Sequence, residues 1–90
     1  MAHTVSAKKR IRQNHASRRR NIWRLRAMRV AIKEFQTALA AGDAGSAREK
    51  FQHAASIVDK TAQKGVIHRN QAARRKSRMN ARLKALATAG

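Results

Sequence analysis

The sequence has no cysteine, no proline and no tyrosine, and only four of its 90 residues are acidic. Without cysteine, neither a disulfide framework nor a cysteine-based zinc site can form. A composition without cysteine suits a protein of a reducing compartment. No apolar run approaches the roughly 18 to 20 residues that span a bilayer, and the N-terminus lacks the apolar core of a signal peptide. A chain of this length can form only one domain with a small core. These absences exclude large catalytic architectures, and we expect a cytoplasmic protein without a membrane segment.

Basic side chains dominate instead, and they lie toward the two ends of the chain. The 22 Lys and Arg residues against four Asp and Glu give a net charge of +18. Residues 1–33 carry eleven bases and no acid, residues 34–64 carry four bases and four acids, and residues 65–90 carry seven bases and no acid. A run of charge is usually a solvated face. Two acid-free blocks around a neutral segment, however, are typical of a surface that binds a polyanion.

A long first helix is predicted from Ser6 to Ala41, because proline is absent and the first glycine is Gly42. Ser6 is its predicted N-cap, and its length is about 35 residues. The apolar stripe covers only the second half of this helix and consists of Ile22, Leu25, Met28, Ile32, Phe35 and Leu39. Residues 1–21 are therefore predicted to form a basic arm that projects from a bundle of residues 22–88.

A second helix is predicted after the turn at Gly42. It can begin at Asp43, or at Ser46 in a capping box with Glu49, and Gly65 suits its C-terminal turn. Its apolar stripe consists of Ala47, Phe51, Ala54, Ala55, Val58 and Ala62, with Ile57 beside it.

A third helix is predicted with Asn70 as its cap. Its apolar stripe consists of Ala72, Ala73, Met79, Leu83 and Leu86. Three such stripes predict an all-α fold, an antiparallel three-helix bundle with an extended basic first helix, as a single domain over residues 1–90. Because many contacts involve alanine, we expect a thin core and modest stability away from a partner.

The charges along these helices do not stabilise an isolated bundle. Six same-sign pairs occur at a spacing of four residues, and no opposite-sign pair occurs at a spacing of three or four. At about 0.2–0.5 kcal/mol each, the like pairs cost on the order of 1–3 kcal/mol. Phosphates against the basic faces would offset this cost, so the pattern favours a polyanion-binding surface over a solvated face.

The scarcity of aromatic residues narrows the class of polyanion. One Trp and two Phe are too few for the stacking surfaces of typical single-strand-binding modules, and the spacing of Phe35 and Phe51 indicates core positions. The helices are too long for a helix-turn-helix, and no heptad zipper follows a basic region. Structured RNA, recognised by shape and backbone, therefore fits better than duplex DNA. Trp23, beside Ile22 at the edge of the stripe, can lie at the bundle rim or contact RNA.

A specific motif lies at the start of the third helix. Residues 64–78 read KGVIHRNQAARRKSR. This segment resembles the signature K-G-x-I-H-K-N-x-A-A-R-x-K-S-R of the S-twenty family of bacterial small-subunit ribosomal proteins. Ser6–Arg10 and Ala41–Asp43 follow the same order and similar spacing, so the resemblance covers residues 6–86.

The resemblance implies a three-helix bundle that binds small-subunit (16S) ribosomal RNA directly and clamps RNA elements together during assembly of the small ribosomal subunit. In the family, these elements are the 5′ domain and the long penultimate stem near the 3′ end. Glu34 and Trp23 depart from the family pattern, so the resemblance assigns no RNA contact to either.

The residues expected to bind RNA lie in the two basic blocks. By the resemblance, the first helix contributes Lys8, Lys9 and Arg10, and the third contributes His68, Arg69, Asn70, Arg74, Arg75, Lys76 and Arg78. Further bases and one amide of the same blocks complete the set: Arg12, Asn14, Arg18, Arg19, Arg20, Arg24 and Arg82. Arg69 stands where the family usually has lysine, which keeps the charge but changes the phosphate geometry.

We expect no enzyme activity, no cofactor and no metal. The four histidines show no H-x-x-x-H spacing, and no two carboxylates lie within four residues of each other. Two other functions stay open, a nucleoid-type protein that coats duplex DNA and a membrane-active basic helix. The second is disfavoured because residues 8–21 have no bulky apolar residue except Ile11. The expected partners are small-subunit ribosomal RNA and the small subunit, with no membrane and no homo-oligomer.

Overall fold

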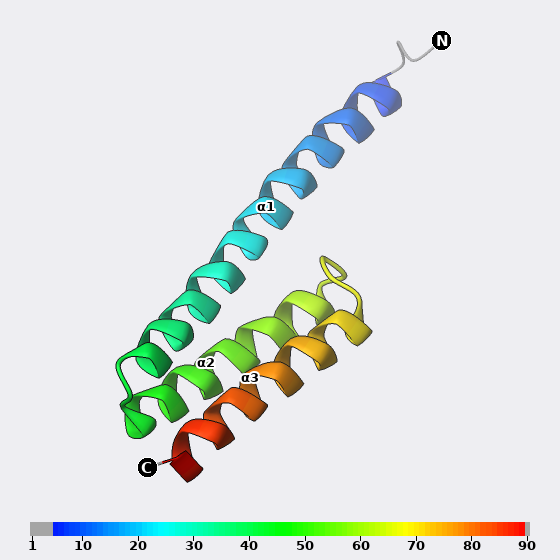
Figure 1. The fold of residues 1–90 in the computed structure, drawn as a ribbon. Helices are drawn as coiled ribbons and strands as arrows, with labels where there is room; N and C mark the ends of the chain where they lie inside the picture. The colour runs from blue at the N-terminus through cyan, green and yellow to red at the C-terminus, as the bar shows by residue number, and fades with distance from the viewer. Residues whose placement is uncertain (1–4, 90) are drawn as a thin grey trace.

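The computed structural model describes residues 5–89 and folds them into three helices. Helix α1 spans Val5–Ala40, α2 spans Ala44–Gln63 and α3 spans Arg69–Ala89. Helix α2 runs antiparallel to both neighbours and packs against each, whereas α1 and α3 contact each other much less (Figure 1). The predicted all-α three-helix arrangement with a long first helix is confirmed. Residues 1–4 of the predicted arm lie outside the described residues.

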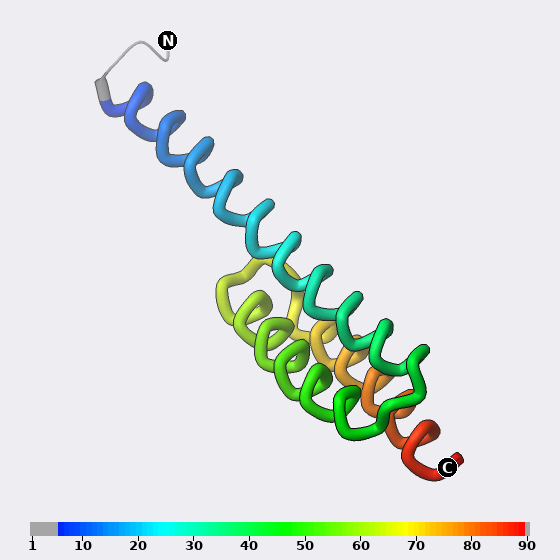
Figure 2. Tube along the Cα trace, turned by 90° about the vertical axis from the view of Figure 1, so that its left-hand side faces the viewer, coloured from blue at the N-terminus to red at the C-terminus, as the bar shows by residue number. Residues whose placement is uncertain are grey.

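The N-terminal part of α1 extends well beyond the other two helices. Figures 1 and 2 both show the α2–α3 loop beside the middle of α1, so the first half of α1 has no helix next to it. We call residues 5–24 the overhang, because the first α1 side chain packed against the core is Leu25. The radius of gyration is 17.9 Å, compared with about 12 Å for a compact chain of this length. The overhang accounts for this elongation.

The core lies between the C-terminal half of α1 and the two shorter helices. Phe35, Met28 and Val58 are its largest fully buried side chains. The ring of Phe35 meets that of Phe51 with the centroids 5.9 Å apart. Five of the ten buried apolar residues within residues 5–89 are alanines, so the core is thin.

Ile22 is an exception to the predicted apolar stripe of α1, because its side chain is 51% exposed. At about 100° per residue, Ile22 lies roughly 120° around the helix from Met28, and this angle turns it away from the core. Ala73 of the third stripe is also exposed, whereas its neighbour Ala72 is buried. Consecutive helical residues point in different directions, so Ala72 joins the core while Ala73 does not.

The ends of α2 follow the sequence closely. The Asp43 carboxylate Oδ1 accepts a hydrogen bond from the Ser46 backbone N–H at 3.1 Å, so Asp43 is the cap and the alternative start at Ser46 is excluded. At the other end, Gly65 has φ +76°. Its N–H donates to the Ala62 carbonyl at 2.9 Å, and the Val66 N–H donates to the Thr61 carbonyl at 3.1 Å. These two bonds form the Schellman turn for which glycine is suited.

Two predicted caps are wrong. Helix α3 begins at Arg69, before the predicted cap Asn70, because His68 takes that role. The His68 Nδ1 accepts a hydrogen bond from the Asn70 N–H at 3.1 Å, and the His68 carbonyl accepts from amides of the next turn. Helix α1 already includes Val5, so Ser6 lies inside its first turn. Neither proline nor glycine occurs next to Ser6, so nothing interrupts the helix at that position.

The Asp43 cap provides a test of the fold. Asp43→Ala removes the acceptor for the Ser46 N–H and is expected to lower the free energy of unfolding by about 0.5–2 kcal/mol. Asp43→Asn keeps an acceptor oxygen and should unfold near the wild-type midpoint. Urea denaturation followed by circular dichroism measures both variants, and equal losses for the two would contradict the capping role.

Candidate nucleic-acid interface

The overhang presents basic residues on opposite sides of α1. Lys8, Arg12 and Arg19 follow each other at spacings of four and seven residues, which places them on one face. Arg10 and Arg24 lie 18 and four residues before Met28, spacings that correspond to about five turns and one turn. They therefore lie on the same side of α1 as Met28, the side that packs into the core. A rod with bases on both sides can contact two nucleic-acid segments at once.

The side chains expected to bind RNA are all accessible. Arg24, Arg75 and Lys76 are half-buried, and the others are exposed: Lys8, Lys9, Arg10, Arg12, Asn14, Arg18, Arg19, Arg20, His68, Arg69, Asn70, Arg74, Arg78 and Arg82. They fall into two groups, one on the overhang and one on α3. The first turn of α3 lies at the end of the bundle from which the overhang projects (Figures 1 and 2).

Three arginines of α3 gather on one side of that helix. Arg75, Arg78 and Arg82 follow spacings of three and four residues and line a cleft of about 170 Å³. Residues of α1 and one methionine of α3 form the rest of the cleft: Ile32, Phe35, Gln36 and Met79. The cleft exists because α1 and α3 do not pack closely. The sequence did not predict it, because no spacing within one helix shows how far apart two helices lie.

Arg75 is the most enclosed base of this cleft. Its Nε atom is buried and has no hydrogen-bond partner within residues 5–89. A buried donor without a partner costs about 1–3 kcal/mol, and more when it is charged. A phosphate group accepts two parallel hydrogen bonds from a guanidinium, one on each of two oxygens. The cleft therefore gathers three guanidinium groups, and one of them has a buried Nε atom without a partner.

Two acids form ion pairs between neighbouring helices. Between α2 and α3, Asp59 Oδ1 lies 2.8 Å from Lys76 Nζ, and between α1 and α2, Glu34 Oε2 lies 3.8 Å from Lys50 Nζ. Sequence spacing could not reveal these pairs, because each joins two different helices. Of the expected RNA-binding residues, Lys76 thus has its charge compensated within the protein. Both pairs are partly exposed, so each is worth at most about 1 kcal/mol.

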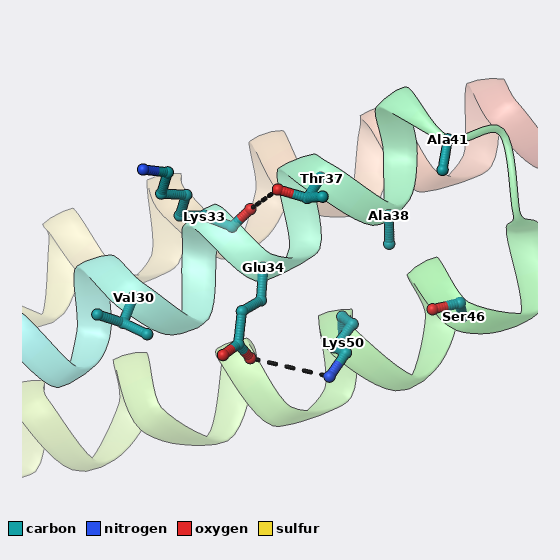
Figure 3. Close-up of a pocket in the computed structure, with 8 residues that line it drawn as sticks. All are labelled: Val30, Lys33, Glu34, Thr37, Ala38, Ala41, Ser46 and Lys50. Atoms are coloured by element: carbon teal, nitrogen blue, oxygen red, sulfur yellow. Dashed lines mark hydrogen bonds and ion pairs between the residues drawn. The ribbon is translucent and has the colours of Figure 1, made fainter.

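An apolar hollow of about 530 Å³ lies between α1 and α2. Figure 3 shows its lining of Val30, Lys33, Glu34, Thr37, Ala38, Ala41, Ser46 and Lys50, with the Glu34–Lys50 ion pair across one side. The pair neutralises both charges, so the hollow lacks the density of bases found on the overhang and α3. It is separate from the two basic groups.

The described part of the chain offers little to other kinds of site. Within residues 5–89, no three His, Asp or Glu side chains lie close enough together to hold one metal ion. None of the three helices is both long and apolar enough to cross a bilayer.

Comparison with known proteins identifies the family. The sequence pattern of the family described as Ribosomal protein S20 matches residues 2–84. The chain belongs to this family. It is 49% identical over 89 residues to the Small ribosomal subunit protein bS20 of Gluconobacter oxydans (strain 621H), which covers 99% of this chain and 100% of that protein. Proteins of the same name from Francisella tularensis subsp. novicida (strain U112) and subsp. holarctica (strain OSU18) are each 47% identical over 89 residues, which covers 99% of both chains. Because S20 proteins are structural components, this family member is not an enzyme.

Trp23 was left undecided by the sequence. It is 66% exposed and is not among the apolar residues packed against the core. The Arg26 guanidinium lies over its ring, 5.4 Å from the centroid. The spacing of three residues between them is the signal that could have revealed this pair.

Proposed function

We propose that this protein is a structural constituent of the small ribosomal subunit, located with it in the cytoplasm. It binds 16S ribosomal RNA directly through two basic surfaces and holds RNA elements together during assembly. The relatives' shared name, small ribosomal subunit protein, supports the assignment to that subunit. The observation that carries the RNA-clamping role is the overhang, a projecting helix with bases on both sides and no acid.

The two surfaces have different parts in this proposal. The overhang projects from the bundle and can lie between RNA segments, contacting phosphates on either side. On α3, the cleft of Arg75, Arg78 and Arg82 receives a phosphate of another segment. The cap residue of α3 contributes as well, because the His68 Nδ1 accepts a backbone hydrogen bond and leaves Nε2 free to donate. The central helix α2 holds the two surfaces in a fixed relation.

Binding through phosphates predicts a strong dependence on salt. Each base that neutralises a phosphate releases a counterion, so the logarithm of affinity falls by roughly 0.7–0.9 per contact for each tenfold rise in salt. About 6 to 10 contacts would weaken binding by 10³- to 10⁵-fold between about 50 and 200 mM salt.

A competition assay tests the proposed ligand. Labelled 16S ribosomal RNA bound to the full chain is challenged with unlabelled 16S RNA or with duplex DNA of the same total phosphate concentration. We expect the RNA to compete more effectively, because its folded shape can meet the overhang and α3 at once. Equal competition by the DNA would instead support a DNA-coating protein and overturn the proposal.

A further inference from the structure

Trp23 is an exposed aromatic residue in the most basic part of the molecule. At 66% its exposure is the highest among the large apolar side chains exposed within residues 5–89. Isolated exposed apolar residues are common on proteins. The Trp23 ring, however, makes no contact with the core and lies on a helix of mostly polar and charged residues. We therefore look for its partner outside the bundle.

The surroundings of Trp23 indicate the chemistry of what it contacts. Arg19, Arg20 and Arg26 lie three or four residues from it, within one helical turn on either side. The nearest acid along α1 is Glu34, eleven residues away. A neutral protein surface closing over this site would bury several guanidinium groups without partners, at a high cost. A polyanion that also carries flat apolar groups can pair with the guanidinium groups and stack on the indole ring.

The ring also has a cationic partner over one face. The Arg26 guanidinium lies over it at 5.4 Å, a cation–π distance. This contact occupies one face of the indole, while the residue as a whole stays 66% exposed and accessible to a second planar group. One face of α1 carries a row of bases that runs along the overhang and ends beside Trp23: Lys8, Arg12, Arg19 and Arg26.

We infer that Trp23 stacks on an unpaired nucleobase of the bound RNA, with Arg26 on the other face of its ring. The arginines around it contact the phosphates that flank this base. A nucleobase stacked on an aromatic side chain beside a basic track is a general mode of binding unpaired RNA. The inference rests on the proposed function and adds a stacking site to it.

The intrinsic tryptophan fluorescence of the protein comes from this site alone, since Trp23 is its only tryptophan and it has no tyrosine. Full-length protein is titrated with 16S ribosomal RNA while tryptophan fluorescence and filter binding are measured on the same samples. Stacking predicts that the fluorescence is quenched in step with the bound fraction. Binding without any change in fluorescence would overturn the stacking inference and leave the proposed function standing. Failure of filter binding itself would overturn the proposed function.

Four variants separate stacking from other uses of the same surface. Trp23→Ala is expected to weaken binding by about 5- to 150-fold. Trp23→Leu should show a similar loss because it lacks a π face, whereas Trp23→Phe should recover most of the affinity. Val30→Ala is the matched control, since Val30 is also an exposed apolar residue, 51% exposed and seven residues further along the same face.

The pattern across these variants decides between the interpretations. We expect Val30→Ala to bind like wild type and the ratio of Trp23→Ala to wild-type affinity to stay constant with salt, because stacking neutralises no phosphate. Wild-type affinity for the RNA in Trp23→Leu would overturn the inference, because leucine keeps an apolar side chain but has no π face. A salt slope that falls in Trp23→Ala would also overturn it, because the change would then act through the neighbouring arginines.

Discussion

Removal of residues 1–20 is expected to weaken binding to 16S ribosomal RNA by roughly 10³-fold at about 0.1 M salt, if about four of the removed bases contact phosphates. The deletion takes away seven bases and no acid. The core should remain intact, because the α1 side chains packed against it begin at Leu25. Filter binding over a range of salt concentrations measures the affinity and its slope, and circular dichroism measures the helix content and unfolding midpoint of the remaining chain.

A second variant separates charge from length. Replacing the same seven bases by glutamine keeps the length of α1, and glutamine is a good helix former. We expect this variant to lose about as much affinity as the deletion. The account would be contradicted if either variant bound within about threefold of wild type. Collapse of the helical signal from residues 21–90 after the deletion would contradict the independence of the bundle.

Neutralising the cleft on α3 is expected to weaken RNA binding by roughly 10²-fold at about 0.1 M salt and to reduce the salt slope by about 2–3. The variant changes Arg75, Arg78 and Arg82 to glutamine together, because these three line one cleft. Lys76 is left unchanged, since its charge is already compensated by Asp59 at 2.8 Å. Salt-dependent binding isotherms give both numbers.

The matched control neutralises three exposed bases on α2 and its C-cap, Arg48, Lys60 and Lys64. It lowers the net charge by the same amount, so a general effect of charge on RNA binding would appear equally in both triple variants. We expect the control to keep nearly the wild-type slope. Equal slopes for the two triple variants would reject the cleft as a phosphate site.

The sequence predicted the helices well and the relations between them poorly. Gly42, Gly65 and the apolar spacing were sufficient for three helices, because turn and periodicity signals are local. Ile22 was misplaced because it lies at the edge of an apolar stripe, where the direction of a side chain depends on the partner helices. Asn70 was preferred over His68 as a cap because asparagine is the commoner cap, and only the folded loop shows the His68 Nδ1 accepting from the Asn70 N–H.

The candidate site shows the same division. The two basic blocks, their residues and the family resemblance follow from charges and motifs within continuous segments. The cleft around Arg75 depends on the separation of α1 and α3, and the Lys76–Asp59 pair depends on the packing of α2 on α3. Both arise between helices, so no spacing along the chain predicts them.

In the proposed function, the overhang and α3 hold two different RNA segments at the same time. Ultraviolet crosslinking of the protein within assembled small subunits, followed by mass spectrometry and sequencing of the attached RNA, tests this claim directly. We predict that peptides of residues 5–24 crosslink to one region of 16S RNA and that peptides of residues 69–82 crosslink to a region distant from it in sequence. Crosslinks of both peptides confined to a single continuous stretch of RNA would contradict the claim.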